Sequence, residues 1–235
     1  MTQGKEEEKV AYVGPFGHSS ESYTFWDEYD LKFKDDILKY KIIKVKIYYQ
    51  SEEKENVEEK YIIGLAFTYE NFYTGEKQVI EHKGSDLISG FKELIIEPGD
   101  YLKQFHINFK DNFEYISQIG FTTYKNKVIS IGVKDGLDKR IKENNEERVI
   151  VGTYGYLDKT INCIGCLFVK KKDYLRSYLF WVFMMRHMVK NEKYKQFKTD
   201  WDSKYKELDI TYQFVWRAIN LPDAVFSKII KYCII

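Results

Sequence analysis

The chain has 235 residues, 44% of them hydrophobic and 31% charged, which is enough for one substantial core and a smaller second unit. Its formal net charge of +1 excludes a general electrostatic attraction to nucleic acid or anionic lipid. The longest apolar run, 178–185, is shorter than the roughly 20 residues of a membrane-spanning helix, so no transmembrane segment is expected.

Residues 1–9 are mostly polar or charged and predict an N-terminal tail without the features of a signal peptide. Residues 10–171 then show the pattern of strands. Ile43, Val45 and Ile47 alternate with lysines, and Ile63, Leu65, Phe67 and Tyr69 recur at every second position, as in half-buried strands. This spacing predicts a mainly β domain, with further strands expected at 78–82, 93–97, 103–109, 115–123, 127–133, 148–154 and 161–169.

Beyond residue 171 the apolar spacing changes to that of helices. Asp173 is a suitable N-cap for a helix that reaches about Val189, and 194–208 carries an aromatic stripe with helical spacing. We therefore expect an α-helical extension over 172–235. The stretch 175–185 is apolar on nearly every side, so it must be covered either by the later helices or by a partner protein. The candidate docking residues are Phe180, Trp181, Phe183, Met184, Trp201 and Trp216.

Several segments, taken in order, resemble the jacalin-like lectin domain. The opening Gly14-Pro15-Phe16-Gly17 and the later Phe25-Trp26-Asp27 are similar to the family's first strand and loop. The resemblance implies a β-prism of three four-stranded antiparallel sheets over 10–171. The other matching segments are 63–69, 94–102, 119–125, 150–155 and 161–165.

The resemblance also implies a sugar site formed by the loops 17–22 and 158–162. In the family, backbone amides and one carboxylate hold the sugar. Here Asp158 stands where the family has glycine, and Asn162 stands where it has aspartate. An asparagine carries no charge and offers a single acceptor oxygen. The candidate glycan-binding residues are Gly17, His18, Lys159, Thr160 and Asn162.

No catalytic constellation is found in the sequence. The four histidines are scattered, and Cys163-x-x-Cys166 has no second cysteine pair that would complete a zinc site. We therefore expect no enzyme activity, metal or cofactor. The three cysteines are too few for a disulfide framework and favour a cytoplasmic location, including association with the cytoskeleton or an organelle.

Two functions remain open at this point. The leading hypothesis is a non-catalytic structural or adaptor subunit, whose helical extension docks onto protein partners in a larger assembly. Its basis is the altered sugar loops together with the apolar extension. The alternative is a lectin that binds mannose- or glucose-type glycans through the loops 17–22 and 158–162.

Overall fold

The computed structural model describes residues 10–28, 33–54, 57–72, 74–97, 99–110, 115–132 and 147–175. The chain divides into two compact units, Met1–Lys171 and Lys172–Ile235. Residues 171–175 are helical. The expected tail 1–9 and the rest of the expected extension lie outside the described residues, and so do Phe180, Trp181, Phe183, Met184, Trp201 and Trp216.

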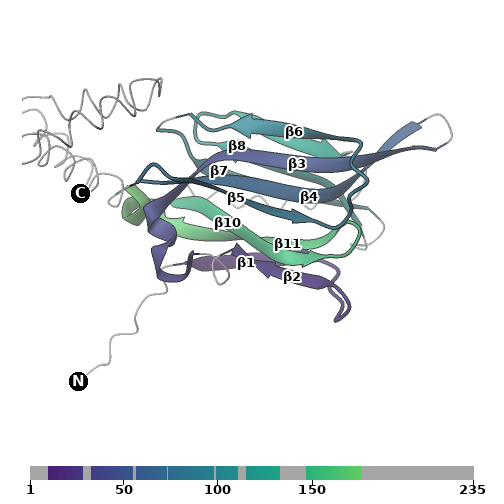
Figure 1. The fold of residues 1–235 in the computed structure, drawn as a ribbon, viewed down its shortest axis with the longest axis horizontal. Coiled ribbons are helices and arrows are strands. Elements are labelled where there is room, and N and C mark those ends of the chain that lie inside the picture. Colours follow the sequence, from purple (N-terminus) through teal and green to yellow (C-terminus); the bar gives the residue numbers. More distant parts are fainter. Residues whose placement is uncertain are drawn as a thin grey trace, which may run out of the picture. The chain divides into compact units, whose positions relative to one another are not determined.

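The first unit is built from strands that form three antiparallel sheets (Figure 1). In the first sheet the order is β1-β11-β10-β2, in the second β5-β4-β3-β6, and in the third β7-β8-β9. One 3₁₀ helix, η2 (Lys34–Lys39), precedes β3. The strands are β1 (Ala11–Gly17), β2 (Thr24–Asp27), β3 (Tyr40–Lys54), β4 (Val57–Asn71), β5 (Lys77–Lys83), β6 (Gly90–Ile95), β7 (Leu102–Lys110), β8 (Tyr115–Thr123), β9 (Val128–Gly132), β10 (Arg148–Leu157) and β11 (Ile161–Lys170).

This is the mainly β, three-sheet architecture expected of a β-prism. The third sheet has three strands among the described residues, where four were expected. The segment that follows β9, 133–146, lies outside those residues. The core fills the space between the sheets, where Phe67 of β4 and Phe121 of β8 meet edge to face at 5.6 Å.

The predicted alternation in β3 and β4 is largely confirmed. Val45, Ile47, Leu65 and Phe67 are fully buried. Two irregularities in the pairing of β3 with β4 interrupt the alternation. The first lies between Ile42 and Lys44, so that Ile42 is buried and Ile43 is only half-buried. The second lies beside Ile63, which packs with Tyr48 and Ala66. A bulge inserts one residue and shifts which side chains face the core, which a strict period of two does not predict.

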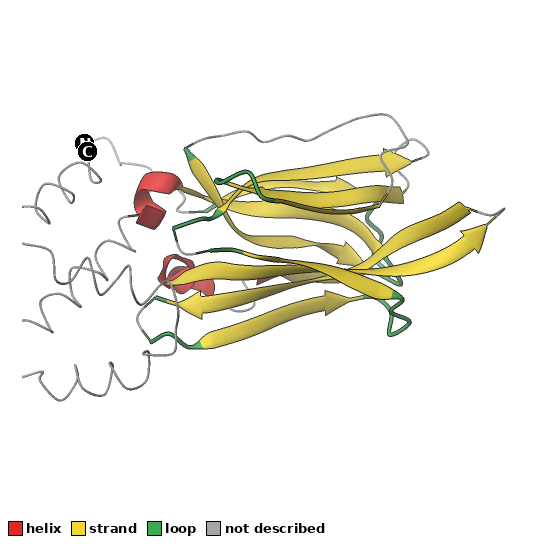
Figure 2. Ribbon diagram, turned by 90° about the horizontal axis from the view of Figure 1, so that it is seen from above, coloured by secondary structure: helices red, strands yellow, loops and turns green. Residues whose placement is uncertain are grey.

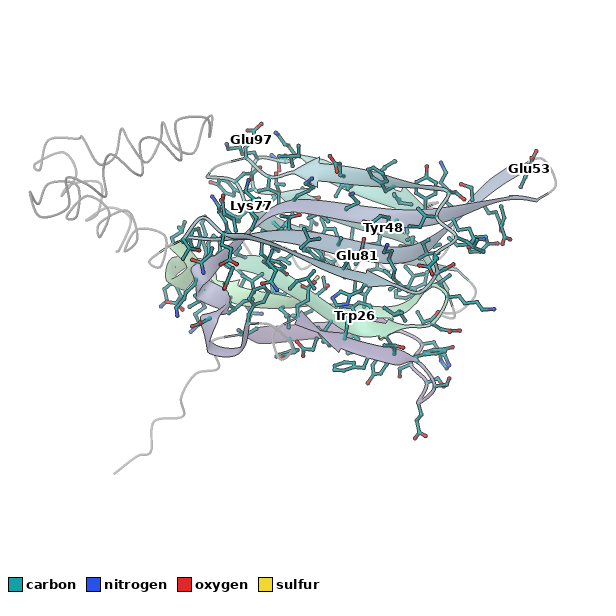
Figure 3. All side chains as sticks on the ribbon, in the orientation of Figure 1. Trp26, Tyr48, Glu53, Lys77, Glu81 and Glu97 are labelled. Carbon is teal, nitrogen blue, oxygen red and sulfur yellow. The ribbon has the colours of Figure 1, made fainter. Side chains whose placement is uncertain are left out.

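The strand register brings three connections to the same end of the prism. They are the loops 18–23, 84–89 and 158–160, which we call the loop end. In Figures 1 and 2 the β3–β4 hairpin projects beyond the other strands, and Figure 3 places Glu53 near its tip and Lys77 and Glu97 at the opposite end. Within the described part of the chain, no helix is long and apolar enough to cross a membrane.

Candidate functional site

The two loops expected to hold sugar meet at the loop end. Gly17 closes β1 with φ +119°, a conformation that side chains rarely allow, and a Cβ on it would overlap the carbonyl oxygen of Asn162. The backbone N–H of His18 donates to that same carbonyl at 3.1 Å. The structure therefore brings Gly17, His18 and Asn162 together.

The turn 158–162 is held by its own hydrogen bonds. The N–H of Asp158 donates to the carbonyl of Thr160 at 3.1 Å, and the Thr160 hydroxyl donates to Oδ1 of Asn162 at 3.0 Å. Asp158 and Lys159 are exposed, whereas Thr160 and Asn162 are half-buried. Because Thr160 engages the acceptor oxygen of Asn162, this side chain presents mainly its amide nitrogen, a donor, to a ligand.

The first loop, 18–23, is ordered by serines. Ser20 accepts hydrogen bonds from the N–H of Tyr23 through its carbonyl at 3.0 Å and from the N–H of Ser22 through its hydroxyl at 3.4 Å. The rings of His18 and Tyr23 meet edge to face at 6.1 Å. Serine side chains commonly close such turns, so the loop keeps a defined shape without the glycines that the family often has there.

A third loop, 84–89, lies against the turn 158–160 and was not predicted as part of the site. A Cβ on Gly84 would overlap the carbonyl oxygen of Asp158. The N–H of Gly84 donates to the carbonyl of Ile63 at 2.9 Å, and at the other end of the loop the N–H of Ser89 donates to the carbonyl of Tyr49 at 3.0 Å. The sequence signal for this loop is the run Gly84-Ser85-Asp86 between two strands, which indicates a turn but not its neighbours.

Two cysteines lie close to the site in the first sheet. Cys163 pairs in register with Gly17, and both Cys163 and Cys166 are buried. Burial raises the pKa of the Cys163 thiol to about 11 because the thiolate is poorly solvated there. Over the described residues, no group of three or more His, Cys, Asp or Glu side chains could hold a metal ion.

Comparison with known proteins identifies the family of this chain. The family model of the jacalin-like lectin domain matches residues 13–167, more than half of the chain. Comparison with curated proteins finds no sequence match.

Solved structures share the fold. The agglutinin of Calystegia sepium is similar with a TM-score of 0.52 and 21% identity, covering 68% of this chain and 97% of its own. The Calsepa lectin in complex with a biantennary N-glycan gives a TM-score of 0.51 and 21% identity over the same shares of the two chains. A mannose-binding jacalin-related lectin from Ananas comosus gives 0.50 and 14%, covering 69% of this chain and 99% of its own.

The family model and the three-sheet fold agree over the same residues. The jacalin-like lectin domain is a non-catalytic family. The chain therefore belongs to the jacalin-like lectin domain family.

Proposed function

We propose that the protein is a carbohydrate-binding lectin, and that its site is formed by the loops 17–22, 84–89 and 158–162. The observation that carries the proposal is the close approach of Gly17 to Asn162 and of Gly84 to Asp158. These two backbone contacts join three loops from different strands into one surface. A fold alone does not imply its familiar function, so the proposal rests on these loops.

The polar groups of this surface suit neutral sugars. Sugar hydroxyls both donate and accept, and the loops offer the amide of Asn162 as a donor and the exposed carboxylate of Asp158 as an acceptor. A carboxylate makes strong charge-assisted hydrogen bonds with hydroxyl groups. In this chain the acid is Asp158, where the family has glycine, and the amide is Asn162, where the family has aspartate. We infer that mannose- or glucose-type glycans are the ligands, since one structural relative is described as mannose-binding and another was solved with an N-glycan.

The structural or adaptor role stays a prediction. It was favoured by the apolar helices after residue 171, and the residues that motivated it lie outside the described part of the chain. The two roles are compatible, because one belongs to the loop end of the first unit and the other to the second unit.

A glycan array followed by titration of mannose-type glycans tests the proposal. We expect saturable binding by the full chain, weaker binding by Asn162→Ala, and tighter binding by Asn162→Asp, because a carboxylate accepts two hydroxyl donors and Thr160 can still donate to it. The matched control is Asn126→Asp, which adds the same charge at an exposed turn in the third sheet. Absence of saturable binding to any glycan, or equal effects of the changes at 162 and 126, would refute the proposed site.

A further inference from the structure

A fully buried carboxylate lies between the first and second sheets. Glu28, directly after β2, accepts hydrogen bonds through Oε2 from the Tyr69 hydroxyl at 2.6 Å and from the Thr153 N–H at 2.7 Å. A buried charge is costly unless it is paired and hydrogen-bonded. The fold therefore supports Glu28 with donors from β4 and β10 at once.

The second oxygen of Glu28 faces a histidine. Nε2 of His82 lies 3.5 Å from Oε1 of Glu28, an ion pair when the imidazole is protonated. The His82 ring stacks on Trp26 with centroids 5.2 Å apart, and the Trp26 N–H donates to the Thr153 hydroxyl at 3.4 Å. Trp26, labelled in Figure 3, also lies over Gly155, where a Cβ would be 2.9 Å from its ring. We call Trp26, Glu28, Tyr69, His82 and Thr153 the Glu28 cluster.

Each loop of the proposed sugar site adjoins a strand that this cluster holds. The loop 18–23 leads into β2, which carries Trp26. The loop 84–89 follows β5, in which His82 is two residues before Gly84. The loop 158–160 follows β10, which carries Thr153. The cluster is thus a common anchor for the three strands from which the loops extend.

We propose that Glu28 is a positioning residue of the sugar site: through the Glu28 cluster it fixes β2, β5 and β10 so that the three loops meet. The inference rests on the proposed function only for the identity of the ligand; the effect of Glu28 on the loops does not depend on it. The carboxylate suits the position because its Oε2 accepts from both Tyr69 and Thr153, while Oε1 faces Nε2 of His82 at 3.5 Å. Glutamine has the same shape but no charge, so its hydrogen bonds with Tyr69 and Thr153 lose their charge assistance and Glu28→Gln should loosen the anchor.

The test compares Glu28→Gln with Asp100→Asn in the full chain. Asp100 is also a buried carboxylate with two backbone donors, the N–H groups of Tyr101 and Lys125 at 3.0 Å each. It lies in the connection between β6 and β7, at the end of the prism opposite the loop end. Amide hydrogen exchange in peptides covering 84–89 and 158–162 reports the loops directly, and titration with a biantennary N-glycan reports binding.

For Glu28→Gln we expect exchange in both loops to accelerate by about tenfold or more, with a similar loss of glycan affinity. For Asp100→Asn we expect faster exchange confined to 99–103 and 123–127, with glycan affinity unchanged. Unchanged loop exchange in Glu28→Gln, or the same loosening of the loops by Asp100→Asn, would overturn the inference.

Two further outcomes are informative. If Glu28→Gln does not fold, His82→Asn and Tyr69→Phe keep the carboxylate and each remove one partner, and the same loop exchange decides the question. If the wild-type chain binds no glycan but Glu28→Gln still loosens the loops, the proposed function fails while the positioning role of Glu28 stands.

Discussion

The α-carbon of Gly17 lies against the carbonyl oxygen of Asn162, leaving no room for a side chain on residue 17. The neighbouring N–H of His18 donates to the same carbonyl at 3.1 Å. This one contact joins the end of β1 to the start of β11 and sets the spacing of the two loops expected to hold sugar. Both the stability of the loop end and its binding surface should depend on it.

Replacing Gly17 by alanine should therefore destabilise the folded protein by more than backbone strain alone would. The positive φ and the overlap with Asn162 together should lower the free energy of unfolding by about 2–4 kcal/mol. Gly99→Ala is the matched control, because Gly99 has φ +73° but no atom within 4 Å of its Cβ position. That control should lose only about 1–2 kcal/mol. Urea unfolding measures both, and equal losses would mean that the contact with Asn162 is unimportant.

Replacing Gly84 by alanine should displace the loop 84–89 from the turn at 158–160. The added methyl group would overlap the Asp158 carbonyl and lie 2.7 Å from the carbonyl carbon of Lys159, both of which are backbone atoms. We expect an overpacking cost of about 1–3 kcal/mol and a clear loss of glycan affinity by calorimetric titration. In the control, Gly90→Ala, the Cβ would meet the ring and hydroxyl of Tyr49, a side chain that can shift. Equal glycan affinity in the two variants would contradict a role for Gly84 in the site.

The sequence predicted the parts of the fold that depend on local patterns. Val45, Ile47, Leu65 and Phe67 are buried as their alternation indicates, because side chains on a strand point to opposite faces in turn. The family resemblance assigned Gly17 and Asn162 to one sugar site; that role stays a prediction, while the structure shows that the two residues are in contact. The exchange of Ile42 for Ile43 in the core was not predictable from the pattern, since it depends on a bulge in the pairing with β4.

The missed parts of the site depend on contacts between residues distant in the sequence. Gly84 and Asp158 meet only because β5 and β10 end on the same side of the prism. Glu28 likewise acquires its role from Tyr69, His82 and Thr153, which come from three other strands. A glutamate that follows Trp26 and Asp27 gives no local indication that it will be fully buried and face residues from three other strands.

Removing the Tyr69 hydroxyl should destabilise the protein through Glu28. Burial, followed by the charge of Glu28, raises the pKa of Tyr69 well above its ordinary value, so this hydroxyl stays protonated and donates. Tyr69→Phe leaves a buried carboxylate oxygen with one donor fewer, which costs about 1–3 kcal/mol. Tyr61→Phe is the control, because the Tyr61 hydroxyl donates to Glu59 at a half-buried position where water can replace it. Denaturant unfolding should show a clearly smaller loss for Tyr61→Phe, and equal losses would argue against a costly buried charge.

The Cys163 thiol should be almost inert in the native protein. Its pKa of about 11, raised by burial from the ordinary 9.0, leaves on the order of one molecule in a thousand as thiolate at pH 8. Alkylation by iodoacetamide should therefore be slow at pH 8 and accelerate as the pH approaches 11.

Because the pKa of Cys163 is raised in the folded protein, the stability linked to this thiol is fully present below pH 9 and is lost as the pH rises through 11. Mass spectrometry of the 160–170 peptide distinguishes Cys163 from Cys166, and the urea-unfolded chain gives the reference rate. Fast alkylation of native Cys163 at pH 8 would mean that the strand pairing of Cys163 with Gly17 opens readily, and the loop end would then be far less rigid than its hydrogen bonds indicate.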